Sequence, residues 1–500
     1  MAAKTKEYGV YIGGEWVDSA GKGTFETTNP ANGRVLATFP NGTKKDVERA
    51  VAAAEKAYPR WRGYPAPRRA EIVLKAALMM EGRKEELGAL VTREMGKVIA
   101  EGRGDVQESI DFLKYISGEG RRLLGETTPS ELPDKICFTL RQPKGVVGCI
   151  TPWNFPTAIP SWKIGAALVC GNTIVFKPAS YTPLCGAALM DVYEEAGLPP
   201  GVLNMVTGEG GVAGTAIVEH PKVRSISFTG SVPVGREVYE KGAKRMVHVH
   251  LELGGKNPII AMEDADLDLL LEGILFGAFG TAGQRCTAAS RLIIHEDIYD
   301  LFMDLFLARV ARLRIGDPID PKVDVGPVVS KGQMERVLNY IAIGKKEGAK
   351  LLCGGHRMTK GAYGKGFFIE PTIFLARHGM RIAVEEIFGP VLSVIKIKSF
   401  EEAIAVANDV EYGLSSSIYT RDINRAWRAI DRLEAGITYI NAPTIGAEVH
   451  LPFGGIKNTG VGGREAGSTA IDEFTEIKTV FIDYSGRLQK AQIEEVKPPE

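Results

Sequence analysis

Two residues of this chain, Cys286 and Glu252, are of the types that can capture a carbonyl compound and later release it. Cys286 lies in Thr281–Thr287, where the thiol is flanked by small residues and an arginine, and Glu252 precedes the paired glycines of Leu251–Lys256. A thiolate can attack a carbonyl carbon, and a carboxylate can activate the water that hydrolyses the resulting thioester. The pair alone is weak evidence, because free cysteines are usually buried apolar residues and acidic side chains are usually solvated.

The segments around these residues alternate between short β-branched runs and amphipathic stretches. We predict strands at 146–151, 173–176, 203–206, 225–228 and 247–251, with helices between them. Strands separated by helices form parallel crossovers, so the pattern favours an α/β fold with a doubly wound parallel sheet. Ligands of such sheets bind beyond the carboxyl ends of the strands.

Each predicted strand ends in a polar or glycine-rich segment. In chain order these are Pro152–Phe155, Lys177–Ser180, Gly208–Gly211, Thr229–Ser231 and Glu252. Five strand ends that converge on one edge predict a nucleotide site there. Gly210, Gly214 and Gly230 would let the backbone approach a pyrophosphate, and Ser231 opens a helix whose N-terminus suits a phosphate. The spacing is not that of the common Gly-x-Gly-x-x-Gly loop.

Other elements are expected to support this sheet. Tyr11–Trp16 reads as a hairpin, and Thr43 with Asp46 suits the start of a helix. The predicted packing faces of two helices carry Val47, Ala50, Val51, Ala54 and Tyr58, and then Ala70, Val73, Leu74, Ala77 and Leu78. Further helices are predicted at 267–279 and 299–313, in a second αβ domain that presents Cys286 to the first.

Composition narrows the class of protein. Five hundred residues predict two or three domains, and 61 basic against 61 acidic residues make nucleic acid an unexpected partner. The six cysteines lack CxxC spacing, which indicates reduced thiols and no metal site. Neither a signal peptide nor a membrane-spanning run is evident, so a cytoplasmic protein without membrane contact is expected. Scarce glutamine beside abundant Arg, Lys and Glu suggests a thermophilic source.

Over essentially the whole chain, the motifs resemble those of the aldehyde dehydrogenase superfamily. They are Leu251–Gly255, Gly283–Cys286, Pro152–Pro156, Phe228–Ser231 and Glu385–Pro390, in the family's order. The resemblance implies an NAD(P)-dependent enzyme that oxidises an aldehyde to the carboxylic acid. It also implies the family's fold, in which residues 1–125 and 142–253 form the dinucleotide-binding domain and 254–455 the catalytic domain. A small β element for oligomerisation would comprise 126–141 and 474–490.

The resemblance assigns catalytic roles to four residues. Cys286 would attack as a thiolate, with a pKa lowered by Arg285 or a helix N-terminus, and the amide of Asn154 would stabilise the oxyanion. Glu252, desolvated among apolar residues, should have a raised pKa and activate the hydrolytic water. Members that pass the acyl group to coenzyme A usually lack this glutamate, so Glu252 favours the hydrolytic branch. Lys163 matches a lysine that helps to relay protons, although a plain surface lysine is the alternative.

One position departs informatively from the family pattern of nucleotide binding. Lys177 is kept, but Ser180 stands where a glutamate usually bonds the adenosine ribose. A carboxylate would repel a 2′-phosphate, whereas a hydroxyl leaves room for Lys177 to pair with it, so NADP is predicted to be preferred. The alternative is that Ser180 tolerates both nucleotides. The full set of predicted cofactor residues is Ile150, Thr151, Pro152, Trp153, Lys177, Ala179, Ser180, Gly210, Gly214, Phe228, Thr229, Gly230, Ser231, Val234, Leu253, Gly254, Gln333, Arg336, Glu386 and Phe388.

The substrate is less well defined. Phe155, Trp162 and Phe453 match tunnel positions, and the loop 441–450 is expected to form the outer rim, with His450 either binding substrate or simply solvated. No arginine is clearly placed to bind a substrate carboxylate. A dehydrogenase specific for 2-oxoglutarate or succinate semialdehyde nevertheless stays an alternative.

Two other classes of protein fit the residues less well. A cysteine hydrolase or esterase that needs no nucleotide would pair Cys286 with a histidine, and no motif supports His248, His250 or His295 in that role. A non-catalytic protein would not need Cys286, Glu252 and Asn154 together. The resemblance also implies a homodimer or homotetramer, in which the β-rich run 478–484 could add to a neighbour's sheet. An edge strand within the same chain is the alternative for this run.

Overall fold

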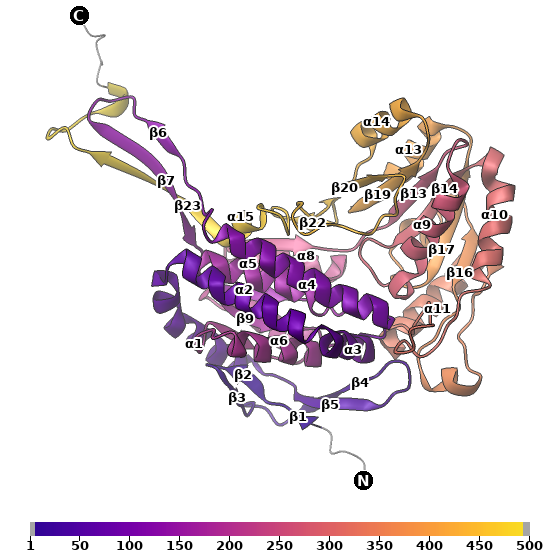
Figure 1. Cartoon of the computed structure of the whole chain (residues 1–500), viewed down its shortest axis with the longest axis horizontal. Helices are drawn as coiled ribbons and strands as arrows, with labels where there is room; N and C mark the ends of the chain where they lie inside the picture. Colours follow the sequence, from indigo (N-terminus) through magenta and orange to yellow (C-terminus); the bar gives the residue numbers. More distant parts are fainter. Residues whose placement is uncertain (1–5, 494–500) are drawn as a thin grey trace, which may run out of the picture.

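The computed structural model describes residues 6–493, which form two large sheets covered by helices and a projecting β arm (Figure 1). Residues 1–5, the start of the predicted 1–125 segment, lie outside the described residues. Within the part described, no helix is both long and apolar enough to cross a membrane. The six cysteines are all free thiols, as predicted.

The first large sheet has eight strands. In spatial order they are β22 (Gly460–Val461), β12 (His248–Glu252), β11 (Val223–Thr229), β8 (Val146–Ile150), β9 (Thr173–Lys177), β10 (Leu203–Met205), β2 (Val10–Ile12) and β3 (Glu15–Val17). The five predicted strands, β8 to β12, are confirmed and run parallel. The chain proceeds from β8 in one direction through β9 and β10, and β11 and β12 lie on the other side. The edge between β8 and β11 is therefore the switch point where ligands bind in such sheets.

Helices cover this sheet, and their starts follow the capping signals in the sequence. They include α1 (Lys44–Gly63), α2 (Ala66–Gly82), α3 (Lys84–Met95), α4 (Ile99–Glu119), α5 (Ala158–Cys170), α6 (Pro183–Glu195), α7 (Thr215–Glu219) and α8 (Val232–Ala243). Thr43 and Asp46 form the capping box of α1, as predicted. On α2 the prediction was partly wrong: Ala70, Val73 and Ala77 are buried, but Leu74 and Leu78 are exposed. Leu74 and Leu78 each follow a buried residue by one position, which turns their side chains about 100° around the helix and away from the buried face.

The second large sheet has seven strands, all parallel except β15. Their order is β15 (Lys350–Cys353), β16 (Thr372–Leu375), β17 (Val391–Ile397), β14 (Ala289–His295), β13 (Asn257–Ala261), β19 (Ser415–Tyr419) and β20 (Ile437–Ile440). Helices α9 (Leu267–Phe279), α10 (Glu296–Val310), α11 (Lys331–Lys346), α13 (Phe400–Asn408) and α14 (Ile423–Arg432) belong to this part. Helix α9 has the predicted bounds. Helix α10 starts three residues earlier than predicted, because His295 caps it by accepting from the Asp297 amide.

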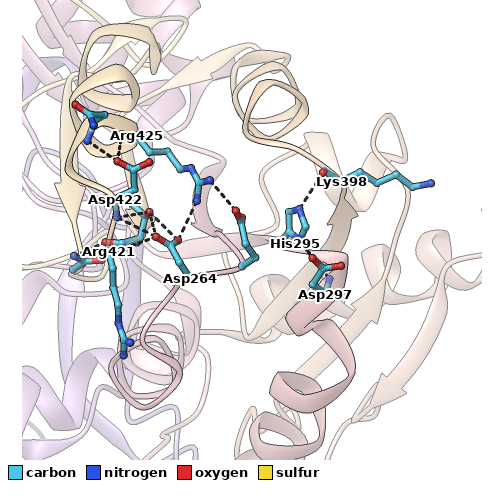
Figure 2. Close-up of polar contacts among 11 residues, drawn as sticks. Asp264, His295, Asp297, Lys398, Arg421, Asp422 and Arg425 are labelled. Atoms are coloured by element: carbon cyan, nitrogen blue, oxygen red, sulfur yellow. Dashed lines mark hydrogen bonds and ion pairs between the residues drawn. The ribbon is translucent and has the colours of Figure 1, made fainter.

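Half-buried and exposed polar contacts fix the loops at the ends of these strands (Figure 2). The Asp264 carboxylate accepts hydrogen bonds from the backbone amides of Arg421 and Asp422 and from the guanidinium of Arg425. Asp422 in turn caps α14 through the Asn424 and Arg425 amides. One carboxylate after β13 therefore sets the position at which the chain leaves β19 and enters α14.

The projecting arm is an antiparallel sheet of β6 (Thr127–Pro129), β7 (Lys135–Pro143) and β23 (Thr475–Asp483) (Figure 1). The small β element predicted at 126–141 and 474–490 thus contains these strands. β23 pairs with β7 of the same chain along its whole length and lies at the edge of the sheet. Ile477 and Phe481 of β23 are 67% and 63% exposed. The arm therefore offers an unpaired strand edge and apolar side chains to a partner.

Candidate active site

Cys286 follows a short segment whose backbone is held in an unusual conformation. Thr281, Ala282 and Gly283 all have positive φ, near 54°, 52° and 69°. Such angles are costly for threonine and alanine, so the surroundings must impose them. Glu101 of α4 does so by accepting from the Thr281 amide at 2.8 Å and from the Arg285 guanidinium at 3.0 Å. On the other side of Cys286, the side-chain amide of Asn257 donates a hydrogen bond to the backbone carbonyl oxygen of Cys286 at 2.8 Å.

Two cavities meet at Cys286. The first, which we call the strand-end cavity, is lined by Pro152, Trp153, Asn154, Ile159, Thr229, Gly230, Ser231, Leu253, Gly254, Cys286, Gln333, Arg336, Glu386 and Phe388. The second, the inner cavity, is lined by Glu108, Phe155, Ile159, Trp162, Thr229, Glu252, Leu253, Arg285, Cys286, Thr287, Gly446, Ala447, Phe453 and Glu465. The structure thus brings the predicted thiol, base, amide and tunnel residues together around one point.

The expected activation of Cys286 by Arg285 was wrong. Burial raises the pKa of the Cys286 thiol to about 12, and the nearby carboxyls of Glu252 and Glu386 add to the effect. Arg285 instead pairs with Glu101 and lies over the rings of Phe155 and Phe276. Its charge is therefore compensated away from the sulfur.

Asn154 lies in the loop between β8 and α5 and is 2% exposed. Its amide oxygen is buried without a protein partner, as is the hydroxyl of Thr229 across the strand-end cavity. Buried polar groups are rarely left unpaired, so both point to a ligand. Asp105 of α4 orders the loop by accepting from the amides of Thr157 and Ala158. A buried ion pair with Lys97, at 3.0 Å, holds Asp105 in place.

Glu252 ends β12 and is 4% exposed. Its pKa is raised well above the ordinary value, first by burial and then by the charge of Glu465, which confirms the prediction of a desolvated carboxyl. One of its oxygens has no partner. A protonated or ionised carboxyl in this setting can exchange a proton with a molecule in the inner cavity.

Lys163 on α5 is 1% exposed, which excludes the alternative of a surface lysine. Its ammonium group donates to the Ser227 hydroxyl at 2.8 Å and pairs closely with Glu465. Glu465 was missed in the sequence because it lies 302 positions from Lys163 in a loop without a recognisable motif. The only signal was indirect: a buried lysine needs a counter-ion.

Glu386 and Gly254 fit together at the floor of the strand-end cavity. The Gly255 amide donates to the Glu386 carboxylate at 3.0 Å. A Cβ on Gly254 would lie 2.2 Å from the same carboxylate, so a larger residue there would require the Glu386 side chain to move. Gln333 and Arg336 of α11 do line the cavity, and their side chains donate to the carbonyls of Phe388 and Glu386. They therefore also hold the 386–388 turn in place.

The predicted adenosine-binding residues lie outside the strand-end cavity. Lys177 is 4% exposed, and burial lowers its pKa to about 8. A Cβ on Gly214 would meet Lys177 and Ile150, so these three positions are neighbours. The Ser180 hydroxyl donates to the Gly208 carbonyl at 2.9 Å. The other predicted residues outside that cavity are Thr151, Ala179, Gly210, Phe228 and Val234, of which Val234 is 46% exposed.

The wall of the inner cavity combines aromatic and charged residues. Phe155, Trp162 and Phe453 line it as predicted, and the rings of Trp162 and Phe453 meet edge to face at 5.1 Å. Of the rim loop 441–450, Gly446 and Ala447 reach the cavity. His450 does not, and lies 3.6 Å from Glu448 with a half-exposed side chain. Glu108, whose pKa burial raises to about 8, was not anticipated. Arg285 was not anticipated as a wall residue.

Residues 6–493 contain no group of three His, Cys, Asp or Glu side chains arranged to hold a metal ion.

Comparisons with known proteins agree with this geometry. The sequence profile of the aldehyde dehydrogenase family matches residues 16–480. The chain is 46% identical to an alpha-ketoglutaric semialdehyde dehydrogenase of Bacillus subtilis, over 94% of this chain and 97% of that protein. It is 42% identical to an alpha-ketoglutarate semialdehyde dehydrogenase of Haloferax volcanii, over 95% and 98%. The crystal structure of betaine aldehyde dehydrogenase from Staphylococcus aureus in complex with NAD+ superposes with a TM-score of 0.94, at 35% identity, over 96% of this chain and 95% of that one.

Proposed function

The chain belongs to the aldehyde dehydrogenase family, and on that premise we propose that Cys286 and Glu252 carry out the oxidation of an aldehyde to its carboxylic acid. The observation that carries the proposal is the position of Cys286 where the strand-end and inner cavities meet. An aldehyde in the inner cavity and a nicotinamide nucleotide in the strand-end cavity would then both reach the sulfur. When bound, the nucleotide supplies a hydride acceptor.

The chain's own residues account for the other steps. The Cys286 sulfur attacks the carbonyl carbon, and its proton leaves to a neighbouring base or water. The amide of Asn154 donates to the oxyanion that forms. After the hydride has left the carbon, a thioester joins the acyl group to the sulfur. Glu252 takes a proton from water as the water oxygen attacks this thioester, and the thiolate departs.

A nicotinamide nucleotide fits the residues of the strand-end edge. Ser231 is the N-cap residue of α8 at the end of β11, where a phosphate would meet the first backbone amides of the helix. Lys177 and Ser180 favour NADP, because a buried cation is available and no carboxylate stands where it would repel a 2′-phosphate. The relative crystallised with NAD+ supports nicotinamide binding in general, and the preference for NADP is our proposal.

A carboxylated semialdehyde is the second candidate substrate. Two relatives above 40% identity are named for alpha-ketoglutarate semialdehyde, and the Arg285 guanidinium stands on the wall of the inner cavity. An arginine there can pair with a carboxylate, although Glu101 already engages it. We therefore propose a 2-oxo-acid semialdehyde as the substrate class to test first.

The domain roles and the oligomeric state that we propose are those implied by the resemblance to the family. Residues 1–125 and 142–253 would bind the nucleotide, 254–455 would present Cys286, and the arm would join two or four copies of the chain. The exposed apolar residues of β23 support the last point.

The test is absorbance of the reduced nicotinamide with a panel of aliphatic, aromatic and carboxylated aldehydes and each nucleotide. Wild type should reduce the nucleotide, and Cys286→Ala should abolish turnover while it retains nucleotide affinity in a binding titration. If Cys286→Ala oxidises aldehydes at the wild-type rate, the proposed mechanism is wrong. If the natural substrate is a carboxylated semialdehyde, Arg285→Lys should weaken the binding of carboxylated aldehydes more than the binding of uncharged ones.

A further inference from the structure

Strand β12 carries three ionisable side chains on one face. His248, His250 and Glu252 are alternate residues, so they project from the same side of the strand at intervals of about 7 Å. Val249 and Leu251 point the other way into an apolar core. The side-chain exposure falls along the series from 34% at His248 to 2% at His250 and 5% at Glu252. The face thus leads from the molecular surface to the catalytic carboxyl.

Two glutamates from elsewhere in the chain fill the gaps in this series. Glu465 lies 3.6 Å from Nδ1 of His250, and Glu473 of α15 (Ala470–Phe474) lies 4.0 Å from the same atom. On the far side, Oε2 of Glu473 is 2.9 Å from Nε2 of His248. Near the active site, Nε2 of His250 is 3.8 Å from Oε1 of Glu252.

His250 is not explained as a packing residue. Both of its ring nitrogens are buried and without a hydrogen-bond partner, which is rare for a polar side chain in a protein interior. Gly462, at positive φ, lies where a Cβ would come within 2.7 Å of the imidazole ring, so the opposing backbone is shaped to the histidine. The groups that face His250 are Glu252, Glu465, Glu473, Lys163 and His248.

We propose that His250 relays the proton of Glu252 to solvent through Glu473 and His248, and so resets the base after each thioester hydrolysis. This inference rests on the proposed function. Glu252 takes one proton from water per turnover and must lose it before the next. The carboxyl of Glu252 gives its proton to Nε2 of His250, while Nδ1 keeps its own hydrogen. The ring then turns, releases the same proton from Nε2 to Glu473, which passes it to His248, and turns back, so that neither the tautomer of His250 nor the number of protons changes.

The negative charge of Glu473 is what makes a charged intermediate on this route accessible. Burial lowers the pKa of His250 and raises that of Glu252, so the ring is neutral at rest and its imidazolium is a short-lived carrier of the proton. Burial opposes ionisation of Glu473, but the hydrogen bond from His248 and the two nearby imidazole rings bring the pKa of Glu473 to about 2. Glu473 is therefore ionised at rest, stabilises an imidazolium on either side, and holds the transferred proton only in passing. Distances of 3.6–4.0 Å exceed those of hydrogen bonds, as is common for catalytic contacts before substrate binds.

The test separates acylation of Cys286 from its deacylation. A nitrophenyl ester acylates the thiol without nucleotide, giving a burst of nitrophenolate followed by a slower steady rate set by hydrolysis. His250→Ala should keep the burst and lower the steady rate by about tenfold or more. Added imidazole should restore much of the loss, and His248→Gln and Glu473→Gln should give smaller losses of the same kind. His220→Gln, at a buried histidine paired with Glu48 away from the site, is the control and should leave both phases unchanged.

Three outcomes are decisive. A steady rate in His250→Ala within about twofold of wild type overturns the relay, above all if Glu465→Gln abolishes deacylation, because the proton then leaves through Glu465 and Lys163. A loss that imidazole does not rescue, with an unchanged solvent deuterium isotope effect, indicates a structural role and also overturns it. Failure of the proposed function looks different, because wild type itself would then give neither a burst nor reduced nicotinamide.

Discussion

At the scale of single residues, one environment raises the pKa of both the Cys286 thiol and the Glu252 carboxyl. Burial is the largest cause of the raised pKa in each case. A raised pKa disfavours the thiolate at neutral pH but makes Glu252 a stronger base once it is ionised. The shared burial therefore favours Glu252 as the base in thioester hydrolysis and disfavours the first attack by the sulfur.

Glu252→Gln should therefore have separate effects on the two half-reactions. The amide cannot accept a proton from water, so deacylation should slow by roughly 10²–10⁴-fold while acylation is retained. In wild type the deacylation rate should rise with pH, because the ionised form of Glu252 is the active one and its pKa lies above the ordinary 4.5. The measurement is the pH profile of single-turnover ester hydrolysis. A Glu252→Gln enzyme that retains the wild-type profile would exclude Glu252 as the base.

Nucleotide choice is also decided by single side chains. Ser180→Glu should place a carboxylate beside the ribose position and raise the KM for NADP by at least about tenfold, since close like charges cost several kcal/mol. The KM for NAD should fall or stay constant. Initial rates with both nucleotides give the comparison, and Thr182→Ser, a conservative change two positions along the chain, serves as the control. Equal effects on both nucleotides would contradict a role in 2′-phosphate selection.

The local motifs pointed to Cys286, Glu252, Asn154 and Lys163 from the sequence alone. Prediction failed where the decisive contact is made over a long sequence separation. Arg285 turns to Glu101, 184 positions earlier, so its charge does not serve the neighbouring sulfur. Glu465 and Glu473 reach the site from after position 460, where nothing local indicates a role. Orientation of a side chain, unlike its presence, depends on such partners.

At the scale of elements, helix α4 positions the chemistry through two carboxylates that line neither cavity. Its Glu101 holds the turn before Cys286, and its Asp105 holds the start of α5, beside the Asn154 loop. The strands were predictable because parallel strands buried on both faces read as β-branched runs. The supporting role of α4 could not be predicted, because in the sequence an acidic residue that caps another element looks like any solvated carboxylate.

Asp105→Ala should therefore destabilise the protein and slow catalysis. Removal of one partner leaves Lys97 as an uncompensated buried charge, which costs about 3–5 kcal/mol. The loosened Asn154 loop should lower kcat more than it raises KM. Urea unfolding and steady-state kinetics check the two effects. Asp111→Ala, at an exposed position of the same helix, should change stability by less than about 0.5 kcal/mol. Equal behaviour of the two variants would refute the role of Asp105.

At the scale of the whole molecule, the arm is the feature that a single chain does not explain. Its strands pair correctly within the chain, yet β23 leaves an edge free and apolar side chains in solvent. Exposed apolar groups gathered on one element usually mark an interface. The arm also joins the segment 126–141 to residues beyond 474, so any partner bound there would brace the end of α15 that carries Glu473.

The final prediction concerns this surface. Replacement of Ile477 and Phe481 together by Asp should convert the expected dimer or tetramer into a smaller species, because burial of these side chains would be lost and charges would oppose association. Light scattering coupled to gel filtration measures the mass, and Lys478→Gln on the same strand is the matched control. Circular dichroism should show an intact fold, since β23 retains its backbone pairing with β7. A wild-type protein that is already a monomer, or a double variant with unchanged mass, would show that the arm has another use.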